Sequence, residues 1–445
     1  MSLLCGRYFI FYGMDSTRGN RYITRMSVTE AIYYQQPYSK ELDAHVVASA
    51  PWGKPAQNLF AVQLARTICY PEGGGQPGDR GNLHSLSDAS RSCRIIDTRK
   101  GDDDAILHIV EGPFPFAIGD SVHMTLDWSH RYEYMQQHTA QHLISGLLYT
   151  RFGIGTVSVH QGEEILTVET DRGDIPVETL HEMESLVNQA IRSCAKVSYE
   201  ERSHSDAEAL GLRRSIKVEG SVRLVRIGDI DVIACGGIHV ASTDEIGLVL
   251  FVGTEMIRGH VRTIWKTADR AVSEIHRNQA IVHELGTVFS AQPQNLVEKA
   301  RQLQMQATDS QWHRQKIASR LAAMLLLVEL EGSDRIVRET PVAVLDISSE
   351  PELSLKQFAE QLDSYEALAL CVVQVADGKL SWMIGLKGPF AEAIPFNVFR
   401  SRLLPMVNGK GGGRPPLWQG VGTDVSDPQA FLREFRTLIE EQGRA

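Results

Sequence analysis

Alternating apolar and polar positions dominate the chain from about residue 27 to residue 128. The alternation falls in short runs bounded by Gly, Pro or Asp, namely HVVASA, NLFAVQLARTICY, RIIDTR, AILHIV and SVHMTLDW. A two-residue period with turn residues between the runs is typical of β-strands joined by short connections. The pattern therefore predicts a small β-barrel or another β-rich domain.

A glycine-rich stretch, YPEGGGQPGDRG, interrupts these strands between Tyr70 and Gly81. It holds five glycines and two prolines in twelve residues. On composition alone it is a surface hairpin. A second interpretation is a loop whose exposed backbone amides approach a ligand closely, because glycine has no side chain to keep the ligand away.

From residue 129 to residue 151 the period becomes helical, and Met135, Leu143 and Leu147 share one apolar stripe. This predicts an amphipathic helix with one buried edge. Strand-like TVSVH and ILTVET come next.

A second helix is predicted over residues 176–193, with Asp174 as its N-cap and Pro176 in its first turn. Residues 216–233 then alternate as a hairpin that leads to Cys235. These elements predict an α/β core with a largely antiparallel sheet.

Residues 269 to about 331 are helical, with an interruption at Pro293. A long helix is predicted from Asn295 to Leu330, ending at Gly332. Its apolar positions suggest an antiparallel helical hairpin or an oligomer seam, and they include Leu296, Ala300, Leu303, Ala307, Ile317, Leu321 and Met324. A solvated linker helix is the alternative.

From Pro341 onward, strand-like runs alternate with helical ones, including helices near 354–364 and at 428–441. Before the last helix lies NGKGGGRPPLWQGVG, residues 408–422. We interpret it as a loop that can cradle a phosphate or sugar between two cations. It lacks the GxxxxGK[ST] order of a P-loop, so nucleotide hydrolysis is not implied.

The predicted fold class is therefore a multidomain α+β and α/β protein. It has an N-terminal small β-barrel, an antiparallel-sheet core with two main helices, a helical linker and a C-terminal α/β domain. The predicted segments are 1–25, an extension of uncertain role, then 26–128, 129–268, 269–332 and 333–445.

Composition adds few restrictions. The 445 residues are 43% hydrophobic and 22% charged, and no apolar run approaches the length of a membrane span. The formal charge of −10 argues against a generic nucleic-acid coat but leaves local basic surfaces open. Six cysteines without a paired framework favour the cytoplasm. Residues 1–25 are basic and poor in acids, so a mitochondrial leader is the alternative.

Two pairs of potential metal ligands stand out. His138 and His142 in QQHTAQH lie one helical turn apart on one face. Cys235 and His239 in ACGGIHVAST have the same spacing. Three imidazoles and a thiolate match a tetrahedral Zn²⁺ shell, so these four residues are the predicted metal ligands. Without the second pair, two histidines with satisfied hydrogen bonds at the core edge would be the simpler interpretation.

The four motifs GGGQPGDRG, QQHTAQH, ACGGIHVASTDEIG and NGKGGGRPPLWQGVG, in this order, resemble the editing half of alanyl-tRNA synthetase. They also resemble the free-standing AlaX-type alanyl-tRNA editing proteins in their long form. The resemblance covers nearly the whole chain from about Met26 and includes the glycine-rich C-terminal domain associated with DHH proteins.

The resemblance implies a zinc-dependent deacylase that acts in trans on Ser-tRNA(Ala), and also on Gly-tRNA(Ala), to maintain translation fidelity. His138, His142, Cys235 and His239 match the family's metal ligands. The C-terminal domain would hold the tRNA elbow, and residues 269–332 could mediate dimerisation. ATP binding is a further expectation from the family alone. The implied tRNA-binding residues are Gly73, Gly74, Gly75, Lys410, Gly411, Gly412, Gly413 and Arg414.

Catalytic candidates lie beside the ligands. Thr139 offers a hydroxyl that could recognise serine or guide water, although it could instead bond its own helix. Gln141, His160 and Gln161 are further candidates around the ligands. Asp231 could orient an imidazole, or it could be a surface residue in a turn.

Three departures from the family pattern matter. Ile238 replaces the usual Thr before the last ligand, His160 stands where Gln is common, and KTADRAV lacks the usual glycine. The alternative is therefore a homologue without catalytic activity, which binds tRNA or a protein and contains a zinc ion with a purely structural role. A zinc peptidase is weaker, because HExxH needs Glu where Thr139 stands.

Overall fold

The structure, a computed structural model, describes residues 12–13, 22–23, 28–54, 58–88, 90–112, 116–332, 336–337 and 339–444. It forms two compact units, residues 1–282 and 283–445. Within the predicted extension 1–25, the described parts are two short antiparallel strands, β1 (Tyr12–Gly13) and β2 (Tyr22–Ile23). The finer division at residues 128, 268 and 332 stays a prediction.

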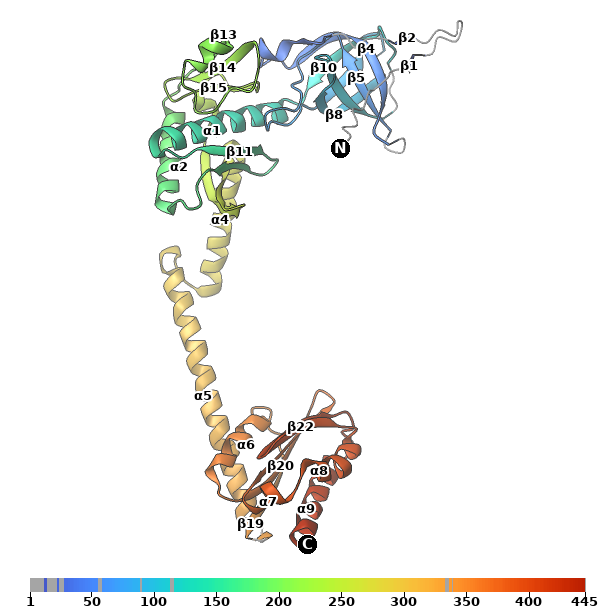
Figure 1. Cartoon of the computed structure of the whole chain (residues 1–445), viewed down its shortest axis with the longest axis vertical. Coiled ribbons are helices and arrows are strands. Elements are labelled where there is room, and N and C mark those ends of the chain that lie inside the picture. The colour runs from blue at the N-terminus through green and yellow to red at the C-terminus, as the bar shows by residue number, and fades with distance from the viewer. Residues whose placement is uncertain are drawn as a thin grey trace, which may run out of the picture. The chain divides into compact units, whose positions relative to one another are not determined.

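The first unit begins with the predicted barrel (Figure 1). Six strands close in the order β10-β4-β5-β9-β8-β7. Alternation explains the closure, because every second residue of β10 (Val122, Met124 and Leu126) points into the barrel core. The strands are β4 (Glu41–Trp52), β5 (Leu59–Leu64), β7 (Gly81–Ser85), β8 (Ser92–Lys100), β9 (Ile106–Glu111) and β10 (Ser121–Leu126).

Beside the barrel, β3 (Glu30–Ala31) pairs in parallel with β6 (Arg66–Thr67), and a 3₁₀ turn, η1 (Ile32–Tyr34), follows β3.

The helix α1 (Trp128–Phe152) organises the rest of this unit. Asp127 caps its start by accepting a hydrogen bond from His130 N–H, and Gly153 ends it with a left-handed φ of 64°. The prediction of a single buried edge is wrong, because residues 137–146 are all buried. The reason is packing on several sides, since α1 contacts α2, η3 and strands from two different sheets.

Two antiparallel sheets and a second helix pack with α1. The first sheet has the order β11-β12-β17-β16 and the second β13-β14-β15, so the predicted antiparallel core is confirmed. The strands are β11 (Thr156–Gln161), β12 (Leu166–Thr170), β13 (Val197–Ser203), β14 (Ser221–Ile227), β15 (Asp231–Ala234), β16 (Val249–Ile257) and β17 (His260–Thr267). The short helices are α3 (His204–Glu208) and η3 (Thr243–Ile246).

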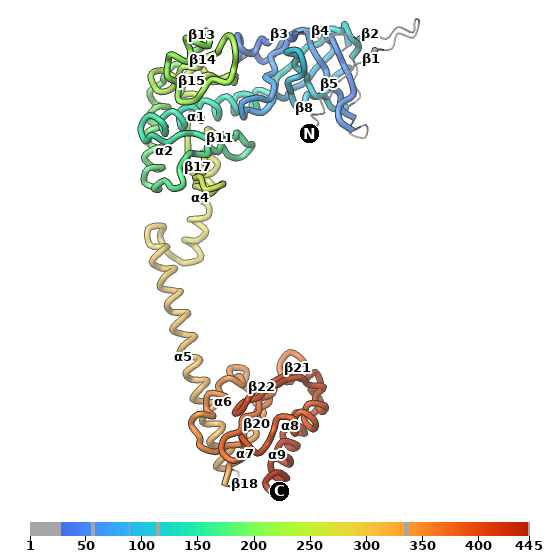
Figure 2. The backbone as a smooth tube through the Cα atoms, in the orientation of Figure 1, coloured from blue at the N-terminus to red at the C-terminus, as the bar shows by residue number. Residues whose placement is uncertain are grey.

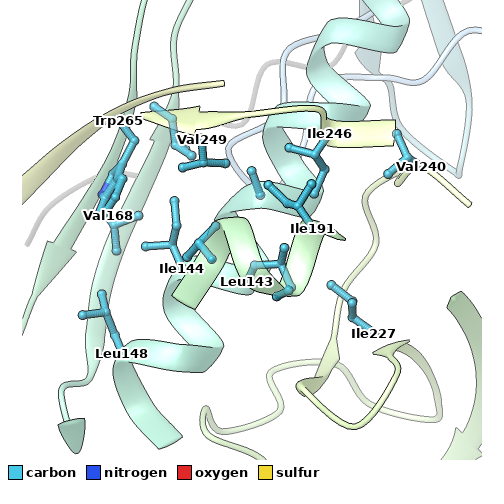
Figure 3. Close-up of a cluster of buried hydrophobic side chains, with 14 of the residues drawn as sticks. Leu143, Ile144, Leu148, Val168, Ile191, Ile227, Val240, Ile246, Val249 and Trp265 are labelled. Atoms are coloured by element: carbon cyan, nitrogen blue, oxygen red, sulfur yellow. The ribbon is translucent and has the colours of Figure 1, made fainter. Parts of the chain in front are cut away.

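The helix α2 (Val177–Arg192) occupies the predicted place. Its N-cap is Pro176, without a side-chain cap, so the prediction that Asp174 caps it is wrong. Apolar side chains from α1, α2 and the sheets meet in one core, where Leu143, Ile144 and Trp265 are fully buried (Figure 3). This core fixes the middle of α1, which carries His138 and His142.

The helix α4 (Ala268–Phe289) leads from the first unit into the second. After the turn η4 (Pro293–Asn295), α5 (Leu296–Glu331) matches the predicted long helix and its break at Pro293. Figure 2 follows the chain through both helices. No described helix is long and apolar enough to cross a membrane.

The second unit is an α/β domain, as predicted. Its six-stranded sheet has the order β18-β19-β20-β21-β23-β22, in which β19 and β20 are parallel and the other neighbours antiparallel. The strands are β18 (Ile336–Val337), β19 (Thr340–Asp346), β20 (Leu368–Ala376), β21 (Lys379–Lys387), β22 (Lys410–Arg414) and β23 (Leu417–Gly422). The helices are α6 (Leu355–Gln361), η5 (Leu362–Ser364), α7 (Pro389–Ala393), α8 (Phe396–Arg402), η6 (Leu404–Val407) and α9 (Pro428–Arg444).

The predicted loop at 408–422 is wrong. It is a hairpin of β22 and β23, and β22 is the edge strand of the sheet. Packing explains one of its glycines, because a Cβ on Gly411 would lie 2.3 Å from the ring of the buried Trp382. Gly411 therefore has a structural reason that composition did not reveal.

Candidate metal centre

Four side chains converge where α1 meets the segment after β15. Their potential ligand atoms, from His138, His142, Cys235 and His239, lie within 4.8 Å of one another. Cys235 Sγ lies 3.4 Å from His138 Nε2 and 3.8 Å from His239 Nε2, and the Nε2 atoms of His239 and His142 are 3.3 Å apart. Tetrahedral Zn²⁺ with ordinary bond lengths places its ligand atoms about 3.3 to 3.6 Å apart. The residues present therefore fit zinc.

Charge at the centre also suits a metal cation. Burial lowers the pKa of His239 to about 3, so this imidazole is neutral and has a free lone pair. Burial alone would raise the pKa of the Cys235 thiol, but His138 and His142 hold it well below its usual value. Burial lowers the pKa of His142, yet Cys235 and Asp231 raise it to about 9 overall. Metal binding would thus find a thiolate and release a proton from His142.

A buried carboxylate and an arginine lie behind His142. Asp231 Oδ2 is 3.3 Å from His142 Nδ1. Arg213 donates two hydrogen bonds, of 2.9 and 3.0 Å, to the two carboxylate oxygens of Asp231. Such a carboxylate orients a metal-binding imidazole and increases its basicity. Asp231 thus lies where it can orient the imidazole of His142, which is one of the two roles considered from the sequence. Arg213 was not identified from the sequence, because it lies in a stretch without periodicity.

An amide takes the corresponding position behind His138. Gln76 Oε1 lies 2.8 Å from His138 Nδ1 and accepts a hydrogen bond of 3.1 Å from Ile238 N–H. Sequence reasoning singled out the glycines around Gln76 and missed the residue itself. Its position one residue after a Gly-Gly pair was the available signal, because such a pair can form a tight turn that directs the next side chain.

The segment after β15 approaches α1 closely. A Cβ on Gly237 would lie 2.0 Å from His138 Cε1 and 2.4 Å from its Nδ1, so only glycine fits. Arg223 holds this segment by donating to the carbonyls of Cys235 and Gly237, at 2.7 and 3.0 Å. Its guanidinium lies 4.1 Å from the ring centre of Tyr199, a cation–π contact.

Three sequence candidates make contacts within the protein. Thr139 is buried, and its hydroxyl donates to Met135 O at 2.8 Å and accepts from Val240 N–H at 3.2 Å. Gln141 Nε2 donates to the hydroxyl of Ser145 at 2.8 Å. The side chain of Ile238 is buried in the main apolar core. The proposed catalytic role of Thr139 stays a prediction.

Three of the remaining candidates, His160, Gln161 and Gly75, line an open cavity of about 330 Å³. Gln76, which was not a candidate from the sequence, also lines it. Gln161 is buried, and both polar atoms of its amide lack a hydrogen-bond partner among the residues that the structure describes. Gln76 also contacts His138, so this one residue connects the lining of the cavity with the metal centre.

The glycine-rich stretch between Tyr70 and Gly81 contains a tight turn, as in the first of its two interpretations, a hairpin. Gly73 and Gln76 exchange two backbone hydrogen bonds of 3.0 Å, and Gly74 and Gly75 between them have φ values of 62° and 89°. Two such values in succession define a turn that favours glycine. The other predicted tRNA-binding residues, Lys410 to Arg414, form β22 in the second unit.

Comparison with known proteins finds relatives over nearly the whole chain. The family described as the threonyl and alanyl tRNA synthetase second additional domain matches residues 222–264. The alanyl-tRNA editing protein AlaX-L of Pyrococcus horikoshii is 36% identical and covers 50% of this chain and 54% of its own. The alanyl-tRNA editing protein Aarsd1 of Mus musculus is 28% identical and covers 89% of this chain and 96% of its own.

The alanine–tRNA ligase of Pyrococcus abyssi is 30% identical over 92% of this chain and 44% of its own. The chain thus spans about half the length of the two archaeal relatives. The four ordered motifs and these similarities agree. The chain is a homologue of the free-standing alanyl-tRNA editing proteins and of the matching part of the alanine–tRNA ligases.

Proposed function

We propose that this protein is an aminoacyl-tRNA hydrolase that acts in trans on mischarged tRNA(Ala), with Ser-tRNA(Ala) as main substrate and Gly-tRNA(Ala) as a second. The observation that carries the proposal is a cluster of three buried histidines and one half-buried cysteine, connected through Gln76 to an open cavity. The similarity to the mouse editing protein, over 96% of that relative, supports it.

His138, His142, Cys235 and His239 would hold Zn²⁺, since their donor set and spacing suit that ion. Bound zinc supplies a positive charge that can polarise a carbonyl or hold an amino group. Because four protein ligands fill a tetrahedral shell, the water and the oxyanion also need protein groups. His160 and Gln161 line this cavity and are our candidates for orienting water and ester there.

Selection against alanine follows from the hydroxyl group of serine. A pocket built for alanine cannot strongly reject serine or glycine, whereas a second site that hydrogen-bonds the hydroxyl rejects alanine strongly. The unpaired amide of Gln161 can donate and accept such bonds. The reaction needs only water, so ATP has no place in the proposal.

The second unit would supply tRNA affinity. Lys410 and Arg414 are the two cations of the edge strand β22, where an RNA backbone could approach. We also propose a homodimer through residues 269–332, because α5 exposes large apolar side chains. Val297, Met305 and Trp312 are 65%, 67% and 55% exposed. The five described cysteines are free thiols, which supports a cytoplasmic location.

The proposal is tested by removing and restoring the metal. Protein stripped with a chelator should lose hydrolysis of Ser-tRNA(Ala), and one equivalent of Zn²⁺ should restore it. Full activity in protein shown to be metal-free by elemental analysis would contradict the proposal.

A tRNA-binding homologue with a purely structural zinc is the second candidate. Two observations favour it: the four ligands complete a tetrahedral shell, and Ile238 places an apolar side chain in the core beside His239. Tight tRNA binding by zinc-loaded protein, with no ester hydrolysis above the rate in buffer, would establish this candidate and reject the first.

A further inference from the structure

The side chain of Gln76 joins the metal centre to the cavity. Its Oε1 faces His138 Nδ1 at 2.8 Å and the backbone N–H of Ile238 at 3.1 Å. Gln76 also lines the cavity that contains Gln161 and His160. The other atom of its amide, Nε2, is buried and has no partner in the described structure. The amide oxygen of Gln76 thus contacts a predicted metal ligand, while the amide nitrogen has no partner among the described residues.

Hydrogen-bond chemistry fixes the orientation of this amide. A backbone N–H can only donate, so the Gln76 atom that faces Ile238 must be the oxygen. That oxygen can only accept, so His138 must carry its proton on Nδ1. The lone pair of His138 is then on Nε2, the atom that lies 3.4 Å from Cys235 Sγ. Gln76 therefore selects the tautomer of His138 that can bind a metal.

The glycine-rich stretch is built to hold Gln76 in place. The turn at Gly74 and Gly75 uses the backbone N–H groups of Gly73 and Gln76 for its own hydrogen bonds. At its other end, buried Asp79 forms an ion pair with buried Arg131 of α1. The stretch is thus tied to the helix that carries His138.

We propose that Gln76 is a positioning residue that fixes His138 for metal binding, and that its Nε2 donates a hydrogen bond to the aminoacyl ester in the cavity. The second half rests on the proposed hydrolase function. A buried amide N–H without a partner is costly, and a carbonyl oxygen of the ester would satisfy it. Gln161 lines the same cavity, and both of its buried amide atoms likewise lack a partner among the described residues. On this view the glycines serve mainly to present a side chain.

Two substitutions separate the two halves of the proposal. Gln76→Glu keeps an oxygen acceptor for His138 and Ile238 but removes the donor. In Gln76→Met the new side chain has a similar length, but both the oxygen acceptor and the amide donor are removed. Gln36→Met is the matched control, because Gln36 is an exposed glutamine whose side-chain oxygen accepts a hydrogen bond from the hydroxyl of its neighbour Ser39.

The metal readout uses full-length protein stripped of metal and titrated with Co²⁺, whose thiolate absorption reports the ligand geometry. Gln76→Met should bind Co²⁺ about 10- to 100-fold more weakly than Gln36→Met, as for other residues that orient metal ligands. Gln76→Glu should bind at least as tightly as the parent. Equal affinity and equal spectra for Gln76→Met and Gln36→Met would overturn the positioning role.

The ester readout uses single-turnover cleavage of Ser-tRNA(Ala) by zinc-loaded protein. Gln76→Glu should lower the cleavage rate about 100-fold or more, as the loss of one oxyanion donor does in other hydrolases. Cleavage at the parental rate would overturn the donor role. If the parent itself does not cleave, the proposed function fails, while the Co²⁺ titration still decides whether Gln76 positions His138.

Discussion

Replacing Gly237 by alanine is expected to disrupt the metal centre with a single methyl group. The added Cβ would lie 2.0 Å from His138 Cε1, 2.4 Å from its Nδ1 and 3.0 Å from Gln76 Oε1. His138 cannot easily retreat, since it is buried on α1 among residues that are also buried. Either the segment after β15 moves outward or the imidazole turns.

The magnitude follows from the cost of overpacking. A methyl group forced into a packed site costs about 1 to 3 kcal/mol. The metal-bound state needs all four ligands in place, so most of this cost should appear in metal affinity. Since about 1.4 kcal/mol corresponds to a factor of ten, we expect affinity to fall about 5- to 150-fold.

The neighbouring glycine provides a matched control. A Cβ on Gly236 would meet only the hydroxyl of Tyr34, at 3.6 Å, an ordinary contact. Competition with a chelator should therefore show near-parental Zn²⁺ affinity for Gly236→Ala and weakened affinity for Gly237→Ala. If both variants bind Zn²⁺ equally well, the close approach of this segment to His138 is wrong.

Three further predictions concern other sites. Asp231→Asn should weaken Co²⁺ binding about tenfold with little change in circular dichroism, because it removes the charge behind His142; unchanged affinity would exclude that role. Burial lowers the pKa of His108 to about 4, so the stability linked to its neutral form is complete above about pH 6.5 and is lost as pH falls toward 4. When the pH is lowered from 7 to 5, the free energy of unfolding measured with urea should fall by about 2 kcal/mol more in the parent than in His108→Gln. Equal decreases in the two proteins would refute this role of His108. Mutating Met305 and Trp312 of α5 to serine should shift the mass measured by light scattering from dimer toward monomer, and a parent that is already monomeric would reject the dimer.

Local patterns predicted the elements of this chain well. Alternation gave the barrel strands, and spacing brought His138 and His142 into register on one helix. These properties depend on residues near one another in sequence, so periodicity and turn chemistry determine them. The same holds for α5, whose start and end follow from Pro293 and Gly332.

Contacts between residues far apart in the sequence determine the features that local patterns could not predict. The burial of α1 on several sides depends on two sheets formed by later strands. Arg213 and Gln76 meet the histidines only after folding, and neither has a distinctive spacing from them. The glycine-rich stretch of β22 looked like a ligand loop because composition cannot tell a flexible loop from a strand in which Gly411 packs against Trp382.

The proposed activity is hydrolysis of mischarged tRNA(Ala) at the metal centre. Its most direct test is a deacylation assay with Ser-, Gly- and Ala-tRNA(Ala) in parallel, using zinc-loaded parent and His142→Ala. We expect the parent to cleave Ser-tRNA(Ala) rapidly, to cleave Gly-tRNA(Ala) more slowly and to spare Ala-tRNA(Ala). We also expect His142→Ala to lose both zinc and activity. Equal treatment of all three tRNAs, or full activity in a zinc-free His142→Ala, would contradict it.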